Sequence, residues 1–316
     1  MIDVVVVSRN NEAQDICSYE LASVDGQPLP AFSAGAHIDV HLPDGVIRQY
    51  SLCNHPEERL RYLIGVLKDP ASRGGSRSLH EQVHEGAHLT ISEPRNLFPL
   101  VHDARRSLLF AGGIGITPIL CMAERLAHAG ADFELHYCAR ASERAAFVQR
   151  LKASPFAERV FLHFDEQPHT ALNAAEVLAA PAGDVHLYVC GPGGFMQHVL
   201  DSARAQGWQE DCLHREYFSA APVDSSLDGG FSVKLGSSGQ VFEIPADKTV
   251  VQVLESHGIE IAVSCEQGIC GTCLTRVLEG IPEHRDLFLT EQEQALNDQF
   301  TPCCSRAKTP LLVLDI

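Results

Sequence analysis

Basic and aromatic residues are scarce in this chain. There are 24 Lys and Arg against 41 Asp and Glu, which gives a formal net charge of −17, and only 7% of the residues are aromatic. Nucleic-acid-binding proteins normally present a basic face, so this balance argues against nucleic acid as a partner. Apolar residues make up 45% and charged residues 21% of the 316 positions. That composition is ordinary for a globular protein with two or three separate cores.

Long apolar runs are also missing. The longest, residues 108–123, is interrupted by glycines, a threonine and a proline, and it is too short to span a bilayer. The N-terminal residues read as a strand and lack the basic segment that opens a secretory signal. We therefore expect a cytoplasmic protein with no membrane partner. Eleven cysteines in that setting indicate metal binding rather than a disulfide framework.

Three patterns of secondary structure follow one another along the chain. Residues 1–101 contain short strands separated by turns, which predicts an antiparallel β-barrel. Residues 102–222 alternate strands and helices, which predicts a parallel α/β sheet. The polar residues 223–230 predict a linker, and residues 231–316 form a third compact unit. In the first region we expect strands at 4–7, 37–42, 49–52 and 61–67.

The third unit contains cysteines with the spacing of a plant-type [2Fe–2S] site. The C-x4-C-x2-C run and one distant thiol are Cys265, Cys270, Cys273 and Cys303. Gly268 and Gly271 allow the loop to approach a cluster and to direct N–H groups at its sulfurs, which raises the reduction potential. Structural zinc usually takes two C-x2-C-like pairs, and here the second pair is missing.

The distant thiol has a neighbour, Cys304, which could serve as the ligand instead. The 30-residue offset from Cys273 favours Cys303. Cys304 would then be packed beside the site rather than bound to iron.

Two segments of the barrel region together indicate a flavin site. Arg48 and Tyr50 of an Arg-x-Tyr-Ser sequence share one face of a strand, from which they can reach a phosphate and a ribityl chain. Ser51 can offer its hydroxyl to flavin N5. Residues 73–78 (Arg-Gly-Gly-Ser-Arg-Ser) could cradle an anion at the start of a helix expected over 78–84. Alone, that second segment would be an ordinary surface turn.

A Gly-rich turn in the α/β region indicates a dinucleotide site. Residues 111–118 (Ala-Gly-Gly-Ile-Gly-Ile-Thr-Pro) follow a strand and open a helix. The sequence is not the G-x-G-x-x-G fingerprint. Gly112, Gly113 and Gly115 nevertheless allow a pyrophosphate to approach the helix N-terminus closely.

A second turn, Cys190-Gly191-Pro192, stands at the end of a later parallel strand, where the ligands of such sheets bind. The Cys190 thiol could lie beside the nicotinamide carbon that gives up hydride. If this motif stood alone, a plain buried cysteine would be the favoured interpretation of Cys190.

Sixteen histidines raise the question of a second metal site. His37 and His41 could share a strand face, but no third ligand stands near them in the sequence. The others, such as His136 and His163, are scattered singly, and we expect all of them to be solvated or structural.

Taken together, these motifs resemble the phthalate dioxygenase reductase family, the flavin- and iron–sulfur-containing reductases of two-component aromatic-ring oxygenases. The resemblance spans the whole chain. It implies an antiparallel flavin-binding β-barrel, a parallel α/β nicotinamide-binding domain and a C-terminal β-grasp ferredoxin domain. It rests on the four cysteines and on Arg48-Gln-Tyr50-Ser51, Gly74-Gly75-Ser76, Gly112 to Pro118, Cys190-Gly191-Pro192 and Glu216-Tyr217-Phe218.

The family implies FMN rather than FAD, and NADH as the electron donor. It places Gly75 and Ser76 at the cofactor phosphate, Thr117 against the flavin and Phe218 near the flavin ring, and it also points to Glu216. Electrons would pass from NADH to FMN, to the [2Fe–2S] cluster and to a Rieske-type oxygenase. The two residues expected at the reacting atoms are Ser51 and Cys190.

Two other functions fit parts of the pattern. A reductase of the same build could serve a haem or di-iron monooxygenase, although the domain order disfavours it. A non-enzymatic iron–sulfur or zinc-binding sensor would contain no flavin and would not oxidise a nicotinamide. The sequence does not identify the substrate of a partner oxygenase.

Overall fold

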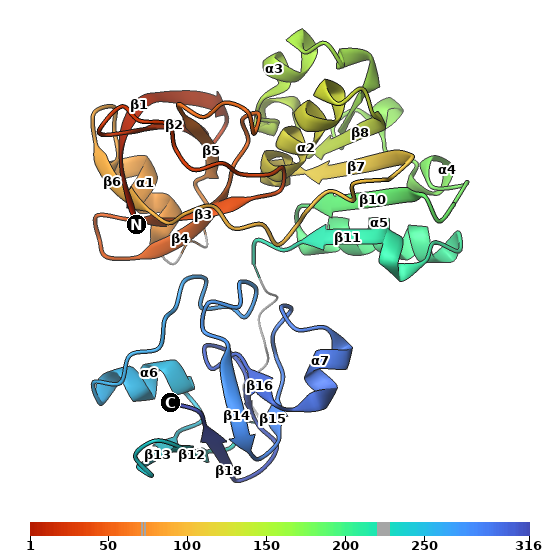
Figure 1. Cartoon of the computed structure of the whole chain (residues 1–316). Coiled ribbons are helices and arrows are strands. Elements are labelled where there is room, and N and C mark those ends of the chain that lie inside the picture. Colours follow the sequence, from red (N-terminus) through yellow and green to blue (C-terminus); the bar gives the residue numbers. More distant parts are fainter. Residues whose placement is uncertain (71, 73, 220–227) are drawn as a thin grey trace. The chain divides into compact units, whose positions relative to one another are not determined.

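The computed structural model describes residues 1–70, 72, 74–219 and 228–316 (Figure 1). They form two compact units, Met1–Tyr217 and Phe218–Ile316. No helix in these ranges is long and apolar enough to cross a membrane.

The N-terminal part of unit 1 is a curled antiparallel sheet in the order β4-β3-β6-β1-β2-β5. Its strands are β1 (Ile2–Ala13), β2 (Ile16–Ser23), β3 (His37–His41), β4 (Ile47–Ser51), β5 (Tyr62–Leu67) and β6 (His88–Ile91). A bridge between Leu52 and Ile64 joins the chain just after β4 to β5, so the two edges of the sheet meet. The predicted antiparallel barrel is confirmed, although the sequence analysis missed β2 and β6.

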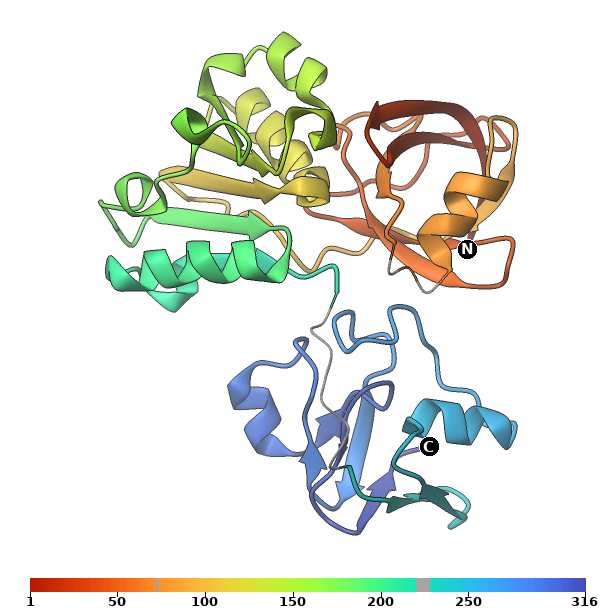
Figure 2. The same cartoon turned by 180° about the vertical axis from the view of Figure 1, so that it is seen from behind.

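Alternating burial explains why these segments are strands. In β1, Val4 and Val6 face the core while Val7 is exposed. Helix α1 (Gly75–Gln82) packs its Leu79 into the same core, and the Tyr19 hydroxyl donates to the Leu79 carbonyl at 3.0 Å. Figure 2 shows α1 against the curled sheet. The helix begins three residues earlier than predicted, at Gly75, with Gly74 as its N-cap.

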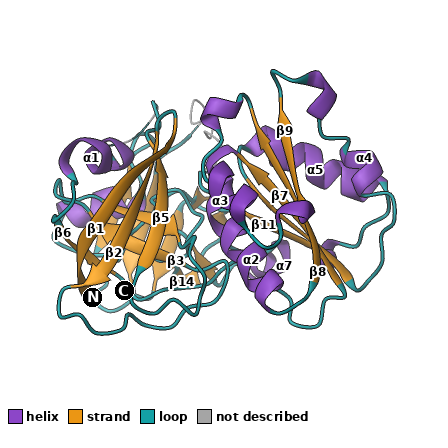
Figure 3. Cartoon of the chain, turned by 90° about the horizontal axis from the view of Figure 1, so that it is seen from above, coloured by secondary structure: helices purple, strands orange, loops and turns teal. Residues whose placement is uncertain are grey.

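The rest of unit 1 is a five-stranded sheet in the order β11-β10-β7-β8-β9, with every neighbouring pair parallel. Its strands are β7 (Arg106–Gly112), β8 (Asp132–Ala139), β9 (Val160–Phe164), β10 (Val185–Cys190) and β11 (Leu213–Glu216). Figure 3 shows the helices on both sides of it, α2 (Ile116–His128) and α3 (Val148–Ala153) on one and α4 (Ala174–Val177) and α5 (Gly193–Ala205) on the other. The strand order reverses between β7 and β10, where such sheets bind ligands.

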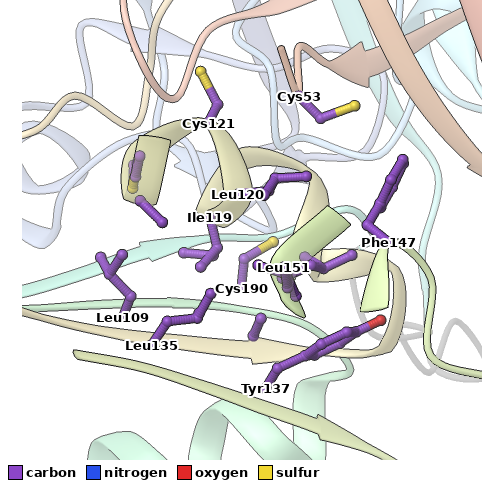
Figure 4. Close-up of a cluster of buried hydrophobic side chains, with 14 of the residues drawn as sticks. Cys53, Leu109, Ile119, Leu120, Cys121, Leu135, Tyr137, Phe147, Leu151 and Cys190 are labelled. Atoms are coloured by element: carbon purple, nitrogen blue, oxygen red, sulfur yellow. The ribbon is translucent and has the colours of Figure 1, made fainter. Parts of the chain in front are cut away.

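The barrel and the parallel sheet share one hydrophobic core. Cys53 and Leu63 of the barrel belong to the same buried cluster as Ile119 and Leu120 of α2. Figure 4 shows Cys53 facing the helix that carries Leu120. The domain boundary predicted at residue 101 therefore lies inside one compact unit.

Unit 2 has a five-stranded sheet in the order β13-β12-β18-β14-β16. Its strands and helices are β12 (Phe231–Leu235), β13 (Val241–Ile244), α6 (Val250–Ser256), β14 (Thr275–Glu279), β15 (Pro282–Glu283), α7 (Glu291–Leu296), β16 (Gln299–Phe300), β17 (Arg306–Ala307) and β18 (Leu311–Leu314). Strand β12 pairs antiparallel with β13 and parallel with β18, and α6 packs on that sheet. This is the predicted β-grasp ferredoxin arrangement.

The predicted linker, 223–230, lies mostly outside the described residues. Residues 228–230 are described, and Asp228 among them accepts two hydrogen bonds from the Arg285 guanidinium, at 2.8 and 2.6 Å. Asp228 is therefore held within the ion-pair network of unit 2.

Candidate cofactor and electron-transfer sites

The two segments predicted to bind flavin lie against each other in the barrel. A Cβ atom added to Gly75, the first residue of α1, would collide with the Arg48 side chain on β4. The backbone N–H of Asp69 donates to the Ser76 hydroxyl at 3.2 Å and holds it at the start of the helix. Arg73, part of the predicted segment, lies outside the described residues.

An unpartnered hydroxyl in the same place fits an anionic ligand. Ser78 Oγ is buried and has no hydrogen-bond partner within the described ranges. It sits in the first turn of α1, whose N-terminal N–H groups favour a phosphate. Burial raises the pKa of Tyr50, so its phenol stays a hydrogen-bond donor. These residues suit the phosphate end of FMN.

A hydrogen bond links the barrel to the edge of the parallel sheet. Ser51 Oγ, at the end of β4, donates to Glu216 Oε2, at the end of β11, over 3.4 Å. Burial raises the pKa of Glu216 to about 8, and the bond from Ser51 offsets part of that shift. Glu216 is therefore a protonated carboxylic acid at neutral pH. Only the family resemblance pointed to this residue, because a four-residue strand has too little periodicity to be recognised.

Cys190 ends β10, beside Glu216 on one neighbouring strand and Ala111 on the other. Its side chain has no exposed area and packs among apolar residues that include Leu109, Leu120 and Tyr137 (Figure 4). Burial raises the pKa of Cys190 well above its usual value, and the Glu216 carboxylate adds to this shift once it is ionised, so Cys190 is a thiol rather than a thiolate. The position of Cys190 at the strand end agrees with a role beside the nicotinamide. Its packing among apolar side chains agrees with the alternative, a plain buried cysteine.

The two predicted Gly-rich turns meet at the switch point of the sheet. A Cβ on Gly115 would collide with the Cys190 carbonyl, and one on Gly191 would come within 2.9 Å of the Gly112 Cα. Gly113 adopts φ +54°. The glycines at 112, 115 and 191 are thus required by the close approach of the two turns.

Thr117 and Phe218 are the residues that the resemblance placed near the flavin. Thr117 lies in the first turn of α2, and its methyl group would contact a Cβ added to Gly65 of β5 in the barrel. Phe218 is 39% exposed and is the first residue of unit 2. Contact of either residue with a flavin stays a prediction.

The four predicted iron ligands form two thiol pairs in unit 2. Cys273 and Cys303 lie in one small buried cluster, and interaction with Cys270 raises the pKa of Cys265. A [2Fe–2S] cluster needs two thiolates on each iron, so two pairs suit it better than a single converging set. Among the described residues, no group of three or more His, Cys, Asp or Glu side chains is placed to hold one metal ion.

The loop between α6 and β14 is shaped by its glycines. Gly268 and Gly271 adopt φ values of +71° and +67°, and a Cβ on Gly271 would collide with the Phe288 ring. Backbone N–H groups point at sulfur, from Gln267 to Cys265 at 3.3 Å and from Thr272 to Cys270 at 3.5 Å. Hydrogen bonds from Cys265 and Thr272 lower the pKa of Cys270 to about 5, which suits a thiolate ligand.

The structure separates Cys303 from its neighbour. Cys303 lies with Cys273 and Val251 in a small buried cluster. The Cys304 sulfur instead faces the Thr301 hydroxyl at 3.2 Å and the Ser305 hydroxyl at 3.8 Å. Cys304 also packs against that cluster, so Cys303 as the fourth ligand stays a prediction.

Histidines that stand singly in the sequence form two hydrogen-bonded pairs within the described residues. His136 Nδ1 lies 3.1 Å from His163 Nε2, and His186 Nδ1 lies 2.9 Å from His214 Nε2. Each pair joins adjacent parallel strands, so residues 27 or 28 positions apart in the sequence become neighbours. The rings of His136 and Phe110 stack at 5.2 Å, which agrees with a structural role.

Comparison with known proteins covers the whole chain. Residues 233–308 match the family model of the 2Fe-2S iron-sulfur cluster binding domain. A vanillate O-demethylase oxidoreductase of Pseudomonas putida is 79% identical over 100% of both chains. The structure of a phthalate dioxygenase reductase superimposes with a TM-score of 0.79 at 39% identity, covering 100% of this chain and 98% of that one.

A second similar structure bears on the choice of partner. An intact type IV self-sufficient cytochrome P450 monooxygenase matches 100% of this chain with a TM-score of 0.87 at 38% identity. The match covers 41% of that longer chain. Domain order alone therefore does not separate reductases of Rieske oxygenases from those of haem enzymes.

The residues of the site suit the cofactors that the full-length similarities indicate. The protein is an NADH-dependent oxidoreductase that carries FMN and a [2Fe–2S] cluster and passes electrons to an oxygenase component. The chain belongs to the phthalate dioxygenase reductase family.

Proposed function

We propose that this chain is the reductase of a vanillate O-demethylase and that it works in the cytoplasm, where NADH is available and thiols stay reduced. The observation that carries the substrate assignment is the 79% identity, over the full length of both chains, with a vanillate O-demethylase oxidoreductase. The substrate itself binds to the oxygenase and not to this chain. Vanillate is therefore assigned from the similarity of this chain to that reductase.

In this proposal the barrel holds FMN through the residues around the start of α1. Arg48 and the N-terminal N–H groups of the helix neutralise the phosphate, and the Ser76 and Ser78 hydroxyls complete its hydrogen bonds. Gly75 leaves the space that the Arg48 side chain occupies. Tyr50, on the same strand face as Arg48, lies along the ribityl chain. Thr117 and Phe218 complete the surroundings of the isoalloxazine ring.

The nicotinamide dinucleotide binds at the switch point of the parallel sheet. Its pyrophosphate lies over Gly112, Gly113 and Gly115. The nicotinamide end lies next to Gly191 and Pro192. Cys190 lies at the strand end beside this site, and its buried, uncharged thiol adds no charge near the ring.

Glu216 sets the direction of the hydrogen bond at Ser51. When its carboxyl is protonated, it can donate to Ser51 Oγ, and the serine proton is then free to be donated to flavin N5. When Glu216 is ionised, Ser51 must donate to it instead. FMN, when bound, accepts hydride from NADH and releases the electrons singly to the cluster. The residues here supply orientation and hydrogen bonds rather than a catalytic base.

In unit 2, Cys265 and Cys270 hold one iron and Cys273 and Cys303 the other. Along the chain, we assign the barrel to residues 1–101, the nicotinamide-binding region to 102–222, the linker to 223–230 and the ferredoxin domain to 231–316.

Reconstitution tests the substrate assignment. The purified holoprotein, supplied with NADH, is mixed separately with a vanillate-demethylating Rieske oxygenase, a phthalate dioxygenase oxygenase and a bacterial P450. We expect the demethylase to turn over at least ten times faster than the other two. Faster turnover with the P450 would favour the second candidate, a haem-enzyme reductase, which the P450 similarity keeps open.

A further inference from the structure

A bulky aromatic residue stands in a left-handed backbone conformation in the core of unit 1. Phe147, the residue before α3, adopts φ +60° and ψ +12°, and it is only 3% exposed. This conformation is uncommon for any residue with a Cβ atom and unfavourable for a bulky one. Residues in such conformations persist where the surrounding structure holds them, and they gather at functional sites.

Hydrogen bonds hold the backbone on both sides of Phe147. The N–H of Ala146 donates to the Tyr137 hydroxyl, on β8, at 3.0 Å. The Phe147 carbonyl accepts from the N–H of Leu151, in α3, at 2.9 Å. Tyr137 and Leu151 have no exposed area, so water does not compete for these bonds. Figure 4 shows the Phe147 ring directed away from Tyr137. The left-handed turn therefore determines where the ring lies.

The ring ends where the barrel meets the parallel sheet. A Cβ atom added to Gly65, in β5 of the barrel, would lie 3.1 Å from Phe147 Cε2 and 3.2 Å from Phe147 Cζ. The same Cβ would lie 2.8 Å from the methyl carbon of Thr117, in the first turn of α2. All three residues are buried. The barrel, the start of α2 and the segment before α3 thus meet at one point.

This contact leads directly to the Gly-rich turn. Thr117 Oγ1 donates to the Ile114 carbonyl at 3.0 Å, so the threonine is tied to the turn that contains Gly113 and Gly115. A shift of β5 at Gly65 would displace Thr117 and, through that bond, the turn. The barrel is the proposed flavin site and the turn is the proposed pyrophosphate site. The packing at Gly65 therefore affects how closely the two cofactors approach.

We infer that Phe147 is a positioning residue for hydride transfer. Its ring, directed by the left-handed backbone, fills the space between Gly65 and Thr117 and fixes the flavin-binding barrel against the nicotinamide-binding sheet. It acts through these two residues rather than on the reacting atoms. Hydride transfer requires close alignment of donor and acceptor, and a misplacement of about 1 Å costs roughly 100-fold in rate. The inference rests on the proposed placement of the flavin and the nicotinamide.

The first test is anaerobic stopped-flow reduction of the flavin in the full-length holoprotein over a range of NADH concentrations. This experiment separates the limiting rate from the dissociation constant of NADH. Phe147→Leu withdraws the ring from Gly65, and Gly65→Ala presses on the same point from the barrel. We expect the limiting rate to fall roughly 10- to 100-fold in each variant, with nearly unchanged dissociation constants of NADH and FMN.

The second test needs no cofactor. Hydrogen exchange of the flavin-free protein, read by mass spectrometry, reports how firmly each segment is held. We expect Phe147→Leu to speed exchange in residues 63–67 of β5 and in residues 114–119 around the start of α2.

Phe156→Leu is the matched control, because it loses the same ring from the same buried cluster. Phe156 packs edge-on against Phe133 of β8, with 5.6 Å between ring centroids. This variant should keep the limiting rate of the parent, and its exchange in those two segments should stay at the parent level.

The double variant tests whether Phe147 and Gly65 act through one contact. If they do, the combined loss in limiting rate is smaller than the product of the two single losses. Losses that multiply, or an equal loss in Phe156→Leu, would contradict the inference.

An unchanged limiting rate in Phe147→Leu, together with a lower unfolding temperature, would show that Phe147 only stabilises the core. Unchanged exchange at both segments would also overturn the inference. If Phe147→Leu does not fold, Gly65→Ala decides alone, and a limiting rate equal to that of the parent contradicts the role of the contact. Failure of NADH to bleach the flavin of the parent protein would instead refute the proposed function itself.

Discussion

At the scale of single residues, the pair formed by Ser51 and Glu216 determines how hydride transfer depends on pH. The pKa of Glu216 is raised to about 8 by burial, so the acid is protonated below that pH and ionised above it. We expect the rate of flavin reduction by NADH to decline as the pH rises through 8. Stopped-flow bleaching of the flavin between pH 6 and 10 measures this profile.

The matched variant for this profile is Glu216→Gln, which always has a donor for Ser51 and has no ionisable group. It should keep the rate seen at neutral pH and lose the alkaline decline.

The free energy of unfolding provides a second readout. Because the native state holds a proton on Glu216 that the unfolded chain releases above about pH 4.5, stability falls as the pH rises from there to 8. The slope approaches about 1.4 kcal/mol per pH unit, and Glu216→Gln should remove it.

Most of the candidate site residues could be predicted from the sequence because their spacing is local. The C-x4-C-x2-C run needs only nine consecutive positions, and Arg48 and Tyr50 lie two residues apart on one strand. The bond from Ser51 to Glu216 joins positions 165 residues apart. No sequence pattern around either residue indicates that the two are in contact. Only the folded chain brings them together.

At the scale of elements, the close contact between α1 and β4 governs flavin binding. We expect Gly75→Ala to displace the Arg48 guanidinium, because the added Cβ would collide with that side chain. Loss of a hydrogen bond from a charged group weakens binding roughly 10- to 100-fold, and this is the loss of FMN affinity we expect. Fluorescence titration of the deflavinated protein with FMN measures it. Gly183→Ala, where an added Cβ contacts nothing, is the control, and equal affinities of the two variants would contradict this account of the phosphate site.

The helices and strands with clear periodicity could be located from the sequence. Where the structure differs from that expectation, the reason lies in the local backbone or in the short length of the element. Residues 142–153 do not form one continuous helix, because Phe147 adopts φ +60° and α3 begins only at Val148. Strands β6 and β11 are four residues each, which is too short for a period to show. Strand pairing across the barrel depends on contacts between distant segments, so the register of β1 with β6 was not accessible from the sequence.

At the scale of the whole molecule, the two units have separate cores, and the cluster belongs to one of them. The buried thiols of Cys273 and Cys303 pack with Val251 inside unit 2. We expect removal of the iron to destabilise unit 2 and to leave the unfolding temperature of unit 1 unchanged. Each kcal/mol lost by a unit of this size lowers its midpoint by roughly 4–8 °C.

The single tryptophan makes this prediction measurable. Trp208 is buried in unit 1, where its Nε1–H donates to the Leu178 carbonyl at 3.0 Å, so its fluorescence reports that unit alone. Thermal unfolding followed by Trp208 fluorescence should coincide for the holoprotein and the iron-depleted protein, while calorimetry should show a second, lowered transition. A shift of the Trp208 transition equal to that of unit 2 would mean that the two units unfold together.

The central claim is that one chain passes electrons from NADH through a flavin to its own iron–sulfur cluster. Anaerobic stopped-flow mixing of the holoprotein with NADH tests it most directly, with the flavin and cluster absorbances followed together and the cluster EPR signal read in frozen samples. The account predicts that the flavin bleaches first, that the cluster signal follows, and that flavin-free protein gives no cluster reduction. A cluster that stays oxidised, or one that NADH reduces equally fast without flavin, would contradict it.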